Sequence, residues 1–373
     1  MGILDAPALS LSAADVRYAR AQGSFNIGPT STRKIRKALA KVRTNSGTAK
    51  ILCLGDSTTW GSTSSGSPIP STTGYPARLR DMLNTYYAPA RTGLAIPTSF
   101  LSSTSIDTRW GLGAGWIKSA TGFANNAGYK GSATSAPLTF TTTTNADAFD
   151  VYYSRNTGLG SIGLSVDGGA VTTVSTAGSA SVQVARVTAT AGVGHVLSIA
   201  QTGGDVFIFG VEPILTTESS IRVGNAGIPS STTTQWKSDT NPTNSLSVVR
   251  AYAPDLTLLM LGINDAGAAV TAATWLTNVT LIAAAAAASG DVILMSVVPS
   301  NPASANDPVL EAQYADQGRA LAASAGYGFI DVFERFGSYA ISNAAGWMND
   351  GAHPTDQGYS DMASAVFATL RSL

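Results

Sequence analysis

The chain has 373 residues, with 23 Lys or Arg against 23 Asp or Glu, so its formal net charge is zero. A balanced charge gives no basic field to hold a nucleic-acid backbone, and we expect no nucleic-acid partner. One cysteine cannot form an internal disulfide or an all-cysteine metal site, and two histidines cannot form a three-histidine zinc site. Chemistry that needs a histidine must therefore use one of two residues.

The composition predicts a folded protein of more than one domain. Hydrophobic residues reach 44% and charged residues only 12%, whereas disordered chains are rich in charge and poor in apolar residues. The length exceeds what one compact core usually holds. The sequence starts without the basic region of a signal peptide, and its longest candidate span, Leu281 to Ala288, is far shorter than the ~20 apolar residues that cross a membrane.

The first 48 residues are interpreted as a lead-in or attachment segment. Ser12 to Arg20 is short and polar and resembles the opening segments of phage tail proteins, which tether a module to a virion. This resemblance implies a possible virion tail partner and an extracellular or virion-associated location. Ser31 to Arg43 is typical of a short basic helix that docks on the following domain.

An α/β domain is predicted for residues 49–101 and 216–373. Four apolar runs have the character of strands buried on both faces of a parallel sheet. Helical segments lie between and after them, and this alternation indicates a three-layer α/β/α (flavodoxin-like) domain with about five parallel strands. The strands are expected at residues 50–55, 256–261, 292–298 and 328–332, and the helices at 272–288, 308–325 and 356–373.

Residues 102–215 lack this alternation of strands and helices, and their pattern predicts an inserted antiparallel β-sandwich or jelly roll. Short alternating runs replace helical periodicity; Phe149, Val151 and Tyr153 share one parity, and Asp167-Gly168 marks a tight hairpin turn. Insertion is tolerated where the termini of the inserted domain lie close together. The insert resembles a carbohydrate-binding module.

A candidate nucleophile follows the first buried strand. In Gly55-Asp56-Ser57-Thr58, the serine projects from the carboxyl end of a parallel strand, where open α/β sheets bind ligands. Position 59 is threonine, so this is not the Gly-x-Ser-x-Gly elbow. Taken alone, the Gly-Asp-Ser motif is also typical of an ordinary turn.

A candidate base and its orienting acid precede the last helix. In Asp350-Gly351-Ala352-His353, the acid can fold back and accept the imidazole Nδ1–H, which leaves Nε2 free to take a proton from a serine hydroxyl. The other histidine, His195, alternates with Leu197 and Ile199 on a strand of the insert, so we interpret it as a packed structural histidine.

Together these motifs resemble the SGNH (GDSL-type) hydrolase family. Gly262-Ile263-Asn264-Asp265 matches the Gly-x-Asn-Asp block of that family, and Ile221 to Ser230 is similar to its Asn-x-Gly-like loop. The resemblance implies Ser57, His353 and Asp350 as the catalytic residues. It also implies an oxyanion hole made by the Ser57 N–H, the Asn264 amide and a backbone N–H of either Ser230 or Gly227.

Three further residues are predicted to lie at the substrate. Trp60 and Trp347 flank the serine and histidine motifs in sequence and could form walls of the pocket, and Asp56 adjoins the nucleophile, where it is also expected to shape the loop. The resemblance implies neither a metal nor an organic cofactor. We expect a serine esterase, most simply an O-acetyl esterase acting on a cell-surface polysaccharide or a small ester. A lipase or thioesterase, and a catalytically idle phage receptor-binding protein, are the alternatives.

Overall fold

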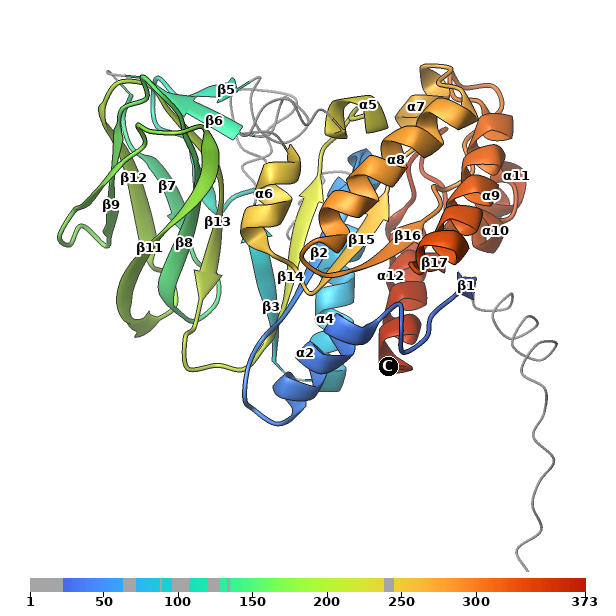
Figure 1. The fold of residues 1–373 in the computed structure, drawn as a ribbon, viewed down its shortest axis with the longest axis horizontal. Coiled ribbons are helices and arrows are strands. Elements are labelled where there is room, and N and C mark those ends of the chain that lie inside the picture. Colours follow the sequence, from blue (N-terminus) through green and yellow to red (C-terminus); the bar gives the residue numbers. More distant parts are fainter. Residues whose placement is uncertain are drawn as a thin grey trace, which may run out of the picture.

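The computed structural model describes residues 23–62, 72–87, 89–95, 107–119, 128–132, 135–237 and 245–373. An α/β/α body carries a β-sandwich at one side, which lies on the left in Figure 1. The predicted phage-tail-like segment, Ser12 to Arg20, lies outside the described residues.

The α/β/α body is built on a parallel sheet. Among the described residues six strands run parallel, one more than expected, in the order β3 (Ala90–Ala95), β14 (Ile221–Gly227), β2 (Ala49–Gly55), β15 (Leu256–Met260), β16 (Asp291–Met295) and β17 (Gly328–Ile330). Two of the six, β3 and β14, are not among the four apolar runs expected from the sequence. Strand β3 carries Arg91 and Thr92 and lies at the margin of the parallel part, and β14 carries Arg222.

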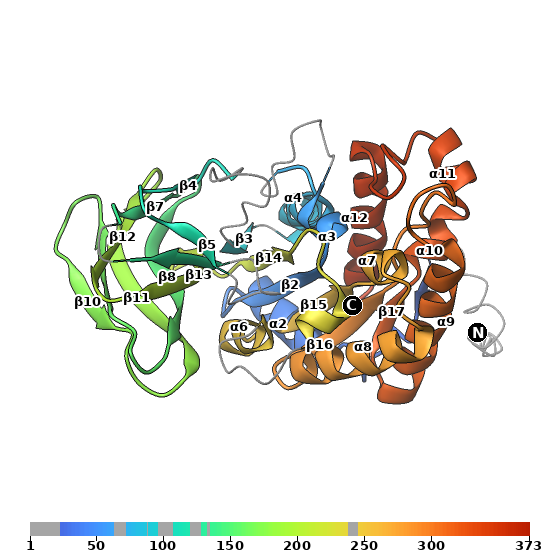
Figure 2. The same cartoon turned by 90° about the horizontal axis from the view of Figure 1, so that it is seen from above.

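Helices cover both faces of this sheet, and the predicted three-layer fold is confirmed. Successive side chains of a strand point to opposite faces, so in β2 Ile51 and Cys53 enter one core, whereas Leu52 and Leu54 enter the other. In Figure 2, α4 and α12 lie on one side of the sheet and α6, α8 and α9 on the other. The first core includes α2 (Arg33–Arg43), α4 (Tyr75–Tyr87), α10 (Val332–Phe336) and α12 (Asp356–Arg371); the second includes α5 (Thr233–Trp236), α6 (Ser245–Tyr252), α8 (Ala272–Ala287) and α9 (Pro308–Ala325).

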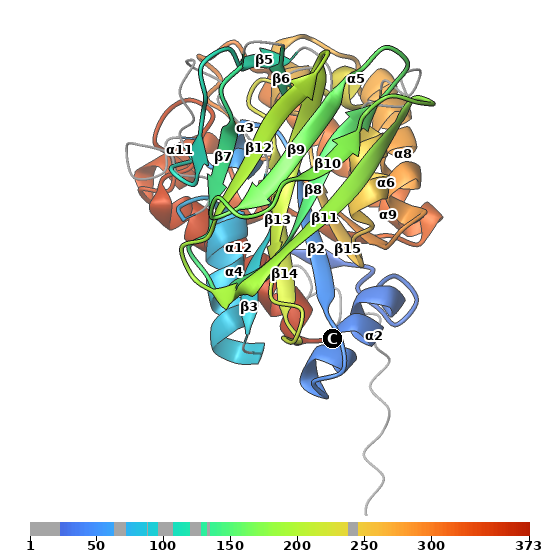
Figure 3. The ribbon, with the colours of Figure 1, turned by 90° about the vertical axis from the view of Figure 1, so that its left-hand side faces the viewer.

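The predicted sandwich consists of two antiparallel layers, one in front of the other where the sandwich is viewed face-on in Figure 3. Phe149, Val151 and Tyr153, which share one parity, are all buried in the core between them. One layer contains β5 (Ile117–Ser119), β6 (Gly128–Gly131), β8 (Ala146–Arg155), β11 (Ser181–Gly192) and β13 (Val206–Ile214); the other contains β4 (Trp110–Gly111), β7 (Leu138–Thr141), β9 (Ser161–Val166), β10 (Thr172–Ser175) and β12 (Val196–Gly203).

The first sandwich layer continues the central sheet, because β13 pairs antiparallel with β3 through Val211 and Ala95. This pairing covers the edge that the parallel sheet would otherwise expose. At the same junction the fully buried Glu212 carboxylate lies 3.2 Å from Lys50 Nζ and accepts hydrogen bonds from the hydroxyls of Tyr152 and Tyr252. The sandwich is therefore joined to the body by backbone pairing and by a buried ionic cluster.

The described part of the lead-in packs onto the α/β/α body. Strand β1 (Ser24–Phe25) pairs with β17, and the apolar face of α2, which includes Ile35 and Leu39, is buried in the first core. Residues 23–48 thus contribute to the body itself, and an attachment role remains a prediction for the residues before them. Within the described residues, no helix is both long and apolar enough to cross the hydrocarbon layer of a membrane.

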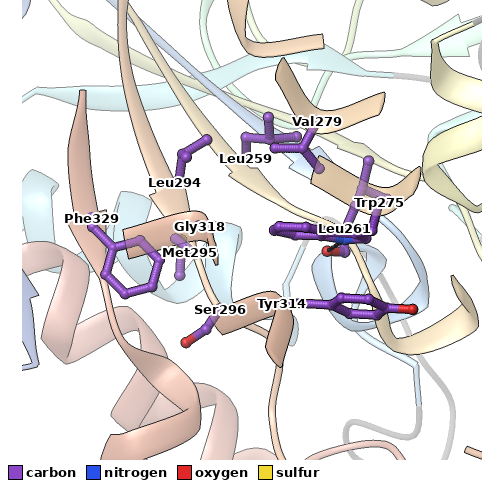
Figure 4. A pocket seen from close by; sticks show the side chains of 10 residues that line it. All are labelled: Leu259, Leu261, Trp275, Val279, Leu294, Met295, Ser296, Tyr314, Gly318 and Phe329. Atoms are coloured by element: carbon purple, nitrogen blue, oxygen red, sulfur yellow. Dashed lines mark hydrogen bonds between the residues drawn. The ribbon is translucent and has the colours of Figure 1, made fainter. Parts of the chain in front are cut away.

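A small internal pocket lies between the sheet and the layer formed by α8 and α9. Figure 4 shows its mainly apolar lining, including Trp275 and Tyr314, whose stacked rings are 4.9 Å apart. Its volume of about 10 Å³ is at or below the least that holds one water molecule. We regard it as a packing gap of the core.

Candidate active site

The carboxyl ends of the parallel strands all meet at one edge of the sheet, and the predicted site residues are at this edge. Strand β2 ends at Gly55, where any Cβ would lie 2.1 Å from Thr59 Oγ1 and 2.4 Å from the Met260 carbonyl oxygen. Only glycine fits there. Asp56 then caps α3 (Ser57–Trp60), since its Oδ1 accepts a hydrogen bond from the Thr58 N–H at 2.9 Å. Ser57 thereby becomes the first residue of a helix directly after a buried strand.

The acid and the histidine are presented by a short hairpin between α11 (Tyr339–Ala344) and α12. Met348 and Pro354 form a β-bridge, and the Asn349 N–H donates to the His353 carbonyl at 2.9 Å. Inside the turn, Asp350 Oδ1 accepts the N–H groups of Ala352 and His353, both at 2.7 Å. The backbone of the turn therefore holds the Asp350 carboxylate in place independently of its contact with the imidazole.

The three predicted catalytic residues lie in one hydrogen-bonded row. His353 Nε2 is 2.8 Å from Ser57 Oγ, and His353 Nδ1 is 3.0 Å from Asp350 Oδ2. If Nδ1 carries the proton that Asp350 accepts, Nε2 presents its lone pair to the serine hydroxyl. The arrangement has the geometry of an activated nucleophile, with a base in reach of the serine and an acid that orients the base.

The charge of Asp350 is stabilised by its surroundings. Burial alone would raise the pKa of this carboxyl, but the hydrogen bonds from the His353 ring and from the Ala352 and His353 N–H groups outweigh it and lower the pKa to about 2. Asp350 is therefore ionised at neutral pH and can stabilise an imidazolium that forms beside it.

Donors for an oxyanion come from three strand ends. Asn264 lies in α7 (Ile263–Gly267), after β15, and its Nδ2 donates one hydrogen to the Ser231 carbonyl at 3.0 Å, which leaves the second amide hydrogen for a substrate. The Ser57 and Ser230 N–H groups make no hydrogen bond within the described part of the chain. All three are available to an oxygen bound at the site.

The structure favours Ser230 over Gly227 as the third donor. Gly227 lies within β14, not in the loop after it, and its N–H donates to Asn225 Oδ1 at 2.9 Å. Ser230 has φ +63°, the left-handed conformation that glycine adopts without strain. Ser230 thus holds a backbone conformation that favours glycine and still provides a backbone N–H donor.

The three predicted substrate-binding residues have different environments. Asp56 is fully buried and caps α3, so it shapes the serine loop and does not face a ligand. Burial raises its pKa to about 7, although the Thr58 N–H and the nearby His353 lower it. Trp60 is only 2% exposed, because its side chain turns from α3 into the interior. Trp347 is partly buried at the base of the histidine hairpin, with its ring 5.2 Å from that of Phe336.

His195 lies in the sandwich, as predicted, and has a carboxylate partner of its own. Its Nδ1 is 2.6 Å from Asp167 Oδ2, and its ring packs edge-on against Phe149. Its Nε2 is buried without a partner among the described residues, so it contacts no serine or threonine hydroxyl there. The described residues also contain no cluster of His, Cys, Asp and Glu that could hold a metal ion.

Asn225, which belongs to the predicted Asn-x-Gly-like loop, orders the Gly227 amide. Two supporting residues were not identified from the sequence. Ser231 holds the Asn264 side chain, and the buried Glu311 accepts the N–H of Ser300, next to Asn301, which binds the histidine hairpin. Only Glu311 leaves a signal in the sequence. It falls on the stripe of Ala315, Gly318 and Ala322 along α9, where an acid is unexpected in a core-facing position.

The chain was compared with known families and structures. Residues 190–360 match the model of the GDSL-like Lipase/Acylhydrolase family, a range that contains Asn264, Asp350 and His353 but not Ser57. No curated protein matches the chain in sequence. A solved structure described as a peptidoglycan O-acetylesterase in action is 20% identical, with a TM-score of 0.70 over 94% of this chain and 99% of that one. The chain thus shares its fold, sandwich included, with that enzyme.

Two further solved structures are similar over less of their fold. A two-domain esterase active on acetylated mannans is 11% identical, with a TM-score of 0.45 over 95% of this chain and 57% of that one. A carbohydrate esterase of family 3 from Talaromyces cellulolyticus is 20% identical, with a TM-score of 0.32 over 40% of this chain and 70% of that one.

Proposed function

We propose that the chain is a serine hydrolase of the GDSL/SGNH type, whose family model matches residues 190–360, and that it removes O-acetyl groups from a cell-surface polysaccharide. The observation that carries the chemistry is the hydrogen-bonded row of Ser57, His353 and Asp350, with 2.8 Å between the serine oxygen and the imidazole. The proposal also agrees with the description of a structure that shares this fold over 94% of the chain, a peptidoglycan O-acetylesterase, although that likeness is one of fold.

The proposed reaction proceeds through an acetyl-serine. Ser57 Oγ attacks the ester carbonyl carbon while His353 Nε2 takes the hydroxyl proton, and Asp350 holds and stabilises the imidazolium. The carbonyl oxygen becomes negative and is held by the Ser57 N–H, the Ser230 N–H and the Asn264 amide. As the intermediate collapses, His353 returns the proton to the departing sugar oxygen.

Water completes the turnover in the same geometry. His353 removes a proton from a water molecule, whose oxygen attacks the acetyl-serine carbonyl, and the same three donors hold the second oxyanion. Collapse of this intermediate releases acetic acid, which ionises to acetate in solution, and the proton returns from His353 to Ser57 Oγ. His353 thus mediates each proton transfer of the cycle within the site.

The acyl group is tested with a series of p-nitrophenyl esters from acetate to palmitate. A deacetylase should give its highest kcat/KM on acetate and lose activity as the chain lengthens. A preference for long chains would contradict the proposal and support a lipase or thioesterase. Release of acetate from O-acetylated polysaccharides, absent with Ser57→Ala, distinguishes a deacetylase from a receptor-binding protein with an idle site.

We also propose that the sandwich holds the glycan. A depression of about 450 Å³, within the size range of small-ligand sites, is lined by the hydroxyl residues Ser165, Thr172, Thr188 and Thr190. The charged side chains of the lining already have partners: Arg186 donates from Nε and Nη2 to Asp150, both at 2.7 Å, and Asp167 contacts the Val196 N–H and His195 Nδ1. The lining therefore suits an uncharged polyhydroxy ligand. Thr188→Trp should fill the depression and weaken glycan binding by Ser57→Ala protein, and unchanged binding would contradict this placement.

We also propose that the protein is located outside the cell and is attached to a virion through the residues before Gly23. It is supported by the phage-tail-like segment in the sequence. The protein should copurify with virions when full-length, and a variant lacking residues 1–22 should not.

A further inference from the structure

Glu311 is a fully buried acid that none of the proposed chemical steps uses. It lies in the first turn of α9, on the face that packs against the sheet. Burial, assisted by the charges of Asp307 and Asp56, raises the pKa of its carboxyl to about 7 despite the hydrogen bonds that Ser300 provides. Burying an acid is unfavourable, and an apolar residue would fill this position in an ordinary core. The presence of an acid at this position is therefore explained only by what its carboxylate binds.

The Glu311 carboxylate holds the loop that supports the histidine hairpin. Its Oε2 accepts the Ser300 N–H at 2.9 Å. The next amide of the chain, the Asn301 N–H, donates to the Gly351 carbonyl at 2.7 Å. Two consecutive amides of one loop thus connect α9 to the residue that follows Asp350.

Packing and internal hydrogen bonds make this loop, residues 299–306, a firm support. A Cβ at Gly351 would lie 3.3 Å from Ser304 Cβ and 3.4 Å from Asn301 Cβ, so the hairpin and the loop are in close contact. Within the loop, the Ser304 hydroxyl donates to the Asn301 carbonyl at 2.6 Å, and the Ala303 N–H donates to Asn301 Oδ1 at 2.9 Å. A displacement of Ser300 would therefore carry Asn301 and the Gly351 carbonyl with it.

We propose that Glu311 is a positioning residue for ester hydrolysis, which sets the Asp350–His353 hairpin against Ser57 through the amides of Ser300 and Asn301. The inference rests on the proposed function, because Glu311 takes no reaction step itself and acts only through the proposed catalytic residues of the hairpin. Its loss should lower kcat and leave KM for a small ester almost unchanged, since it touches no substrate. A displacement of about 1 Å at a reacting group can cost ~10²-fold in rate.

The test compares three substitutions at Glu311 with a control elsewhere. Glu311→Leu keeps the buried volume without an acceptor, Glu311→Ala removes both, and Glu311→Gln keeps an acceptor for the Ser300 N–H. Glu212→Ala is the control, because Glu212 is equally buried but lies between the sandwich and the body. Activity is measured with p-nitrophenyl acetate, and folding by circular dichroism.

We expect Glu311→Leu and Glu311→Ala to lower kcat about 10- to 100-fold, Glu311→Gln to stay within about threefold of wild type, and Glu212→Ala to lower thermal stability with kcat unchanged. Glu311→Leu protein that is folded and keeps kcat within twofold overturns the inference. If Glu311→Ala does not fold, the Leu and Gln variants decide the question. Ser57→Ala is measured alongside: residual activity there contradicts the proposed function, whereas its loss together with full activity of Glu311→Leu contradicts only this inference.

An NMR measurement separates positioning from general destabilisation. The chain has two histidines, so His195→Gln assigns the two imidazole signals. We expect the His353 ring signals to shift in Glu311→Leu and to stay unchanged in Glu212→Ala. Unshifted His353 signals in Glu311→Leu would show that the hairpin does not depend on Glu311.

Discussion

Removal of the Asp350 carboxylate should affect turnover far more than folding. Asp350→Ala takes away the acceptor of the His353 Nδ1–H, 3.0 Å away, and also the acceptor of two backbone N–H groups in the hairpin. In a serine–histidine–acid arrangement, loss of the acid typically lowers kcat ~10⁴-fold. Asp350→Asn keeps an oxygen for the backbone N–H groups but presents an amide to Nδ1, so it should preserve the hairpin and still disfavour the productive tautomer.

The effect of Asp350 on stability follows from its pKa, which is lowered from 3.8 to about 2. A carboxyl with a lowered pKa in the folded state stabilises the protein above its unfolded pKa, and this contribution disappears as pH falls from about 4 to about 2. The full shift corresponds to roughly 2.4 kcal/mol. The side chain is 43% exposed, so solvent screening reduces this to about 1 kcal/mol.

Two assays test this reasoning. Steady-state kinetics with p-nitrophenyl acetate at pH 7 should show kcat lowered at least ~10³-fold in both Asp350 variants. Urea unfolding should show Asp350→Ala less stable than wild type by about 1 kcal/mol at pH 7, with the difference shrinking towards pH 2. A kcat within tenfold of wild type in folded Asp350→Asn would refute the role of the carboxylate, and a stability difference that grows towards pH 2 would refute its electrostatic origin.

Three further substitutions test separate parts of the site. Asn264→Ala should lower kcat ~10²- to 10³-fold at nearly constant KM, and a loss below about threefold would argue against an oxyanion role. Gly227→Ala would place a Cβ 2.1 Å from the backbone nitrogen of Trp60, so chemical denaturation should show the free energy of unfolding lowered by ~1–3 kcal/mol. A denaturation midpoint equal to that of wild type would contradict the observed packing. His195→Gln removes the hydrogen-bonded contact with the half-exposed Asp167, worth at most ~1 kcal/mol, and should leave kcat unchanged. A tenfold loss of kcat would mean that the wrong histidine was assigned as the base.

Strands buried on both faces could be predicted from the sequence because they contain continuous apolar runs. The runs of β2, β15, β16 and β17 fall where they were expected, and so do α8, α9 and α12. Strand β3 contains Arg91 and Thr92, and β14 contains Arg222, so neither has the apolar run of a buried strand. Arg222 is buried beside Glu212, a partner far away in sequence. That such pairs lie together, and that the sandwich continues the sheet, depends on tertiary pairing.

Candidate site residues could be chosen from the sequence where the residue type itself determines the possible chemistry. Ser57, Asp350 and His353 lie together as their motifs implied, because a strand end and a hairpin place them. Proximity in sequence was a poor guide for Trp60, which follows the serine by three residues but is turned into the core by α3. The choice between Gly227 and Ser230 required the backbone, since it depends on which N–H already has a partner.

Acetate release by wild-type and Ser57→Ala protein, measured side by side on O-acetylated polysaccharide and on p-nitrophenyl acetate, tests the central claim most directly. The geometry predicts that wild type hydrolyses both substrates and that the variant, lacking the oxygen 2.8 Å from His353, falls to the background rate while still binding the polysaccharide. Equal turnover by the two proteins would contradict the assignment of Ser57 as nucleophile. No turnover by wild type on either substrate would contradict the esterase itself.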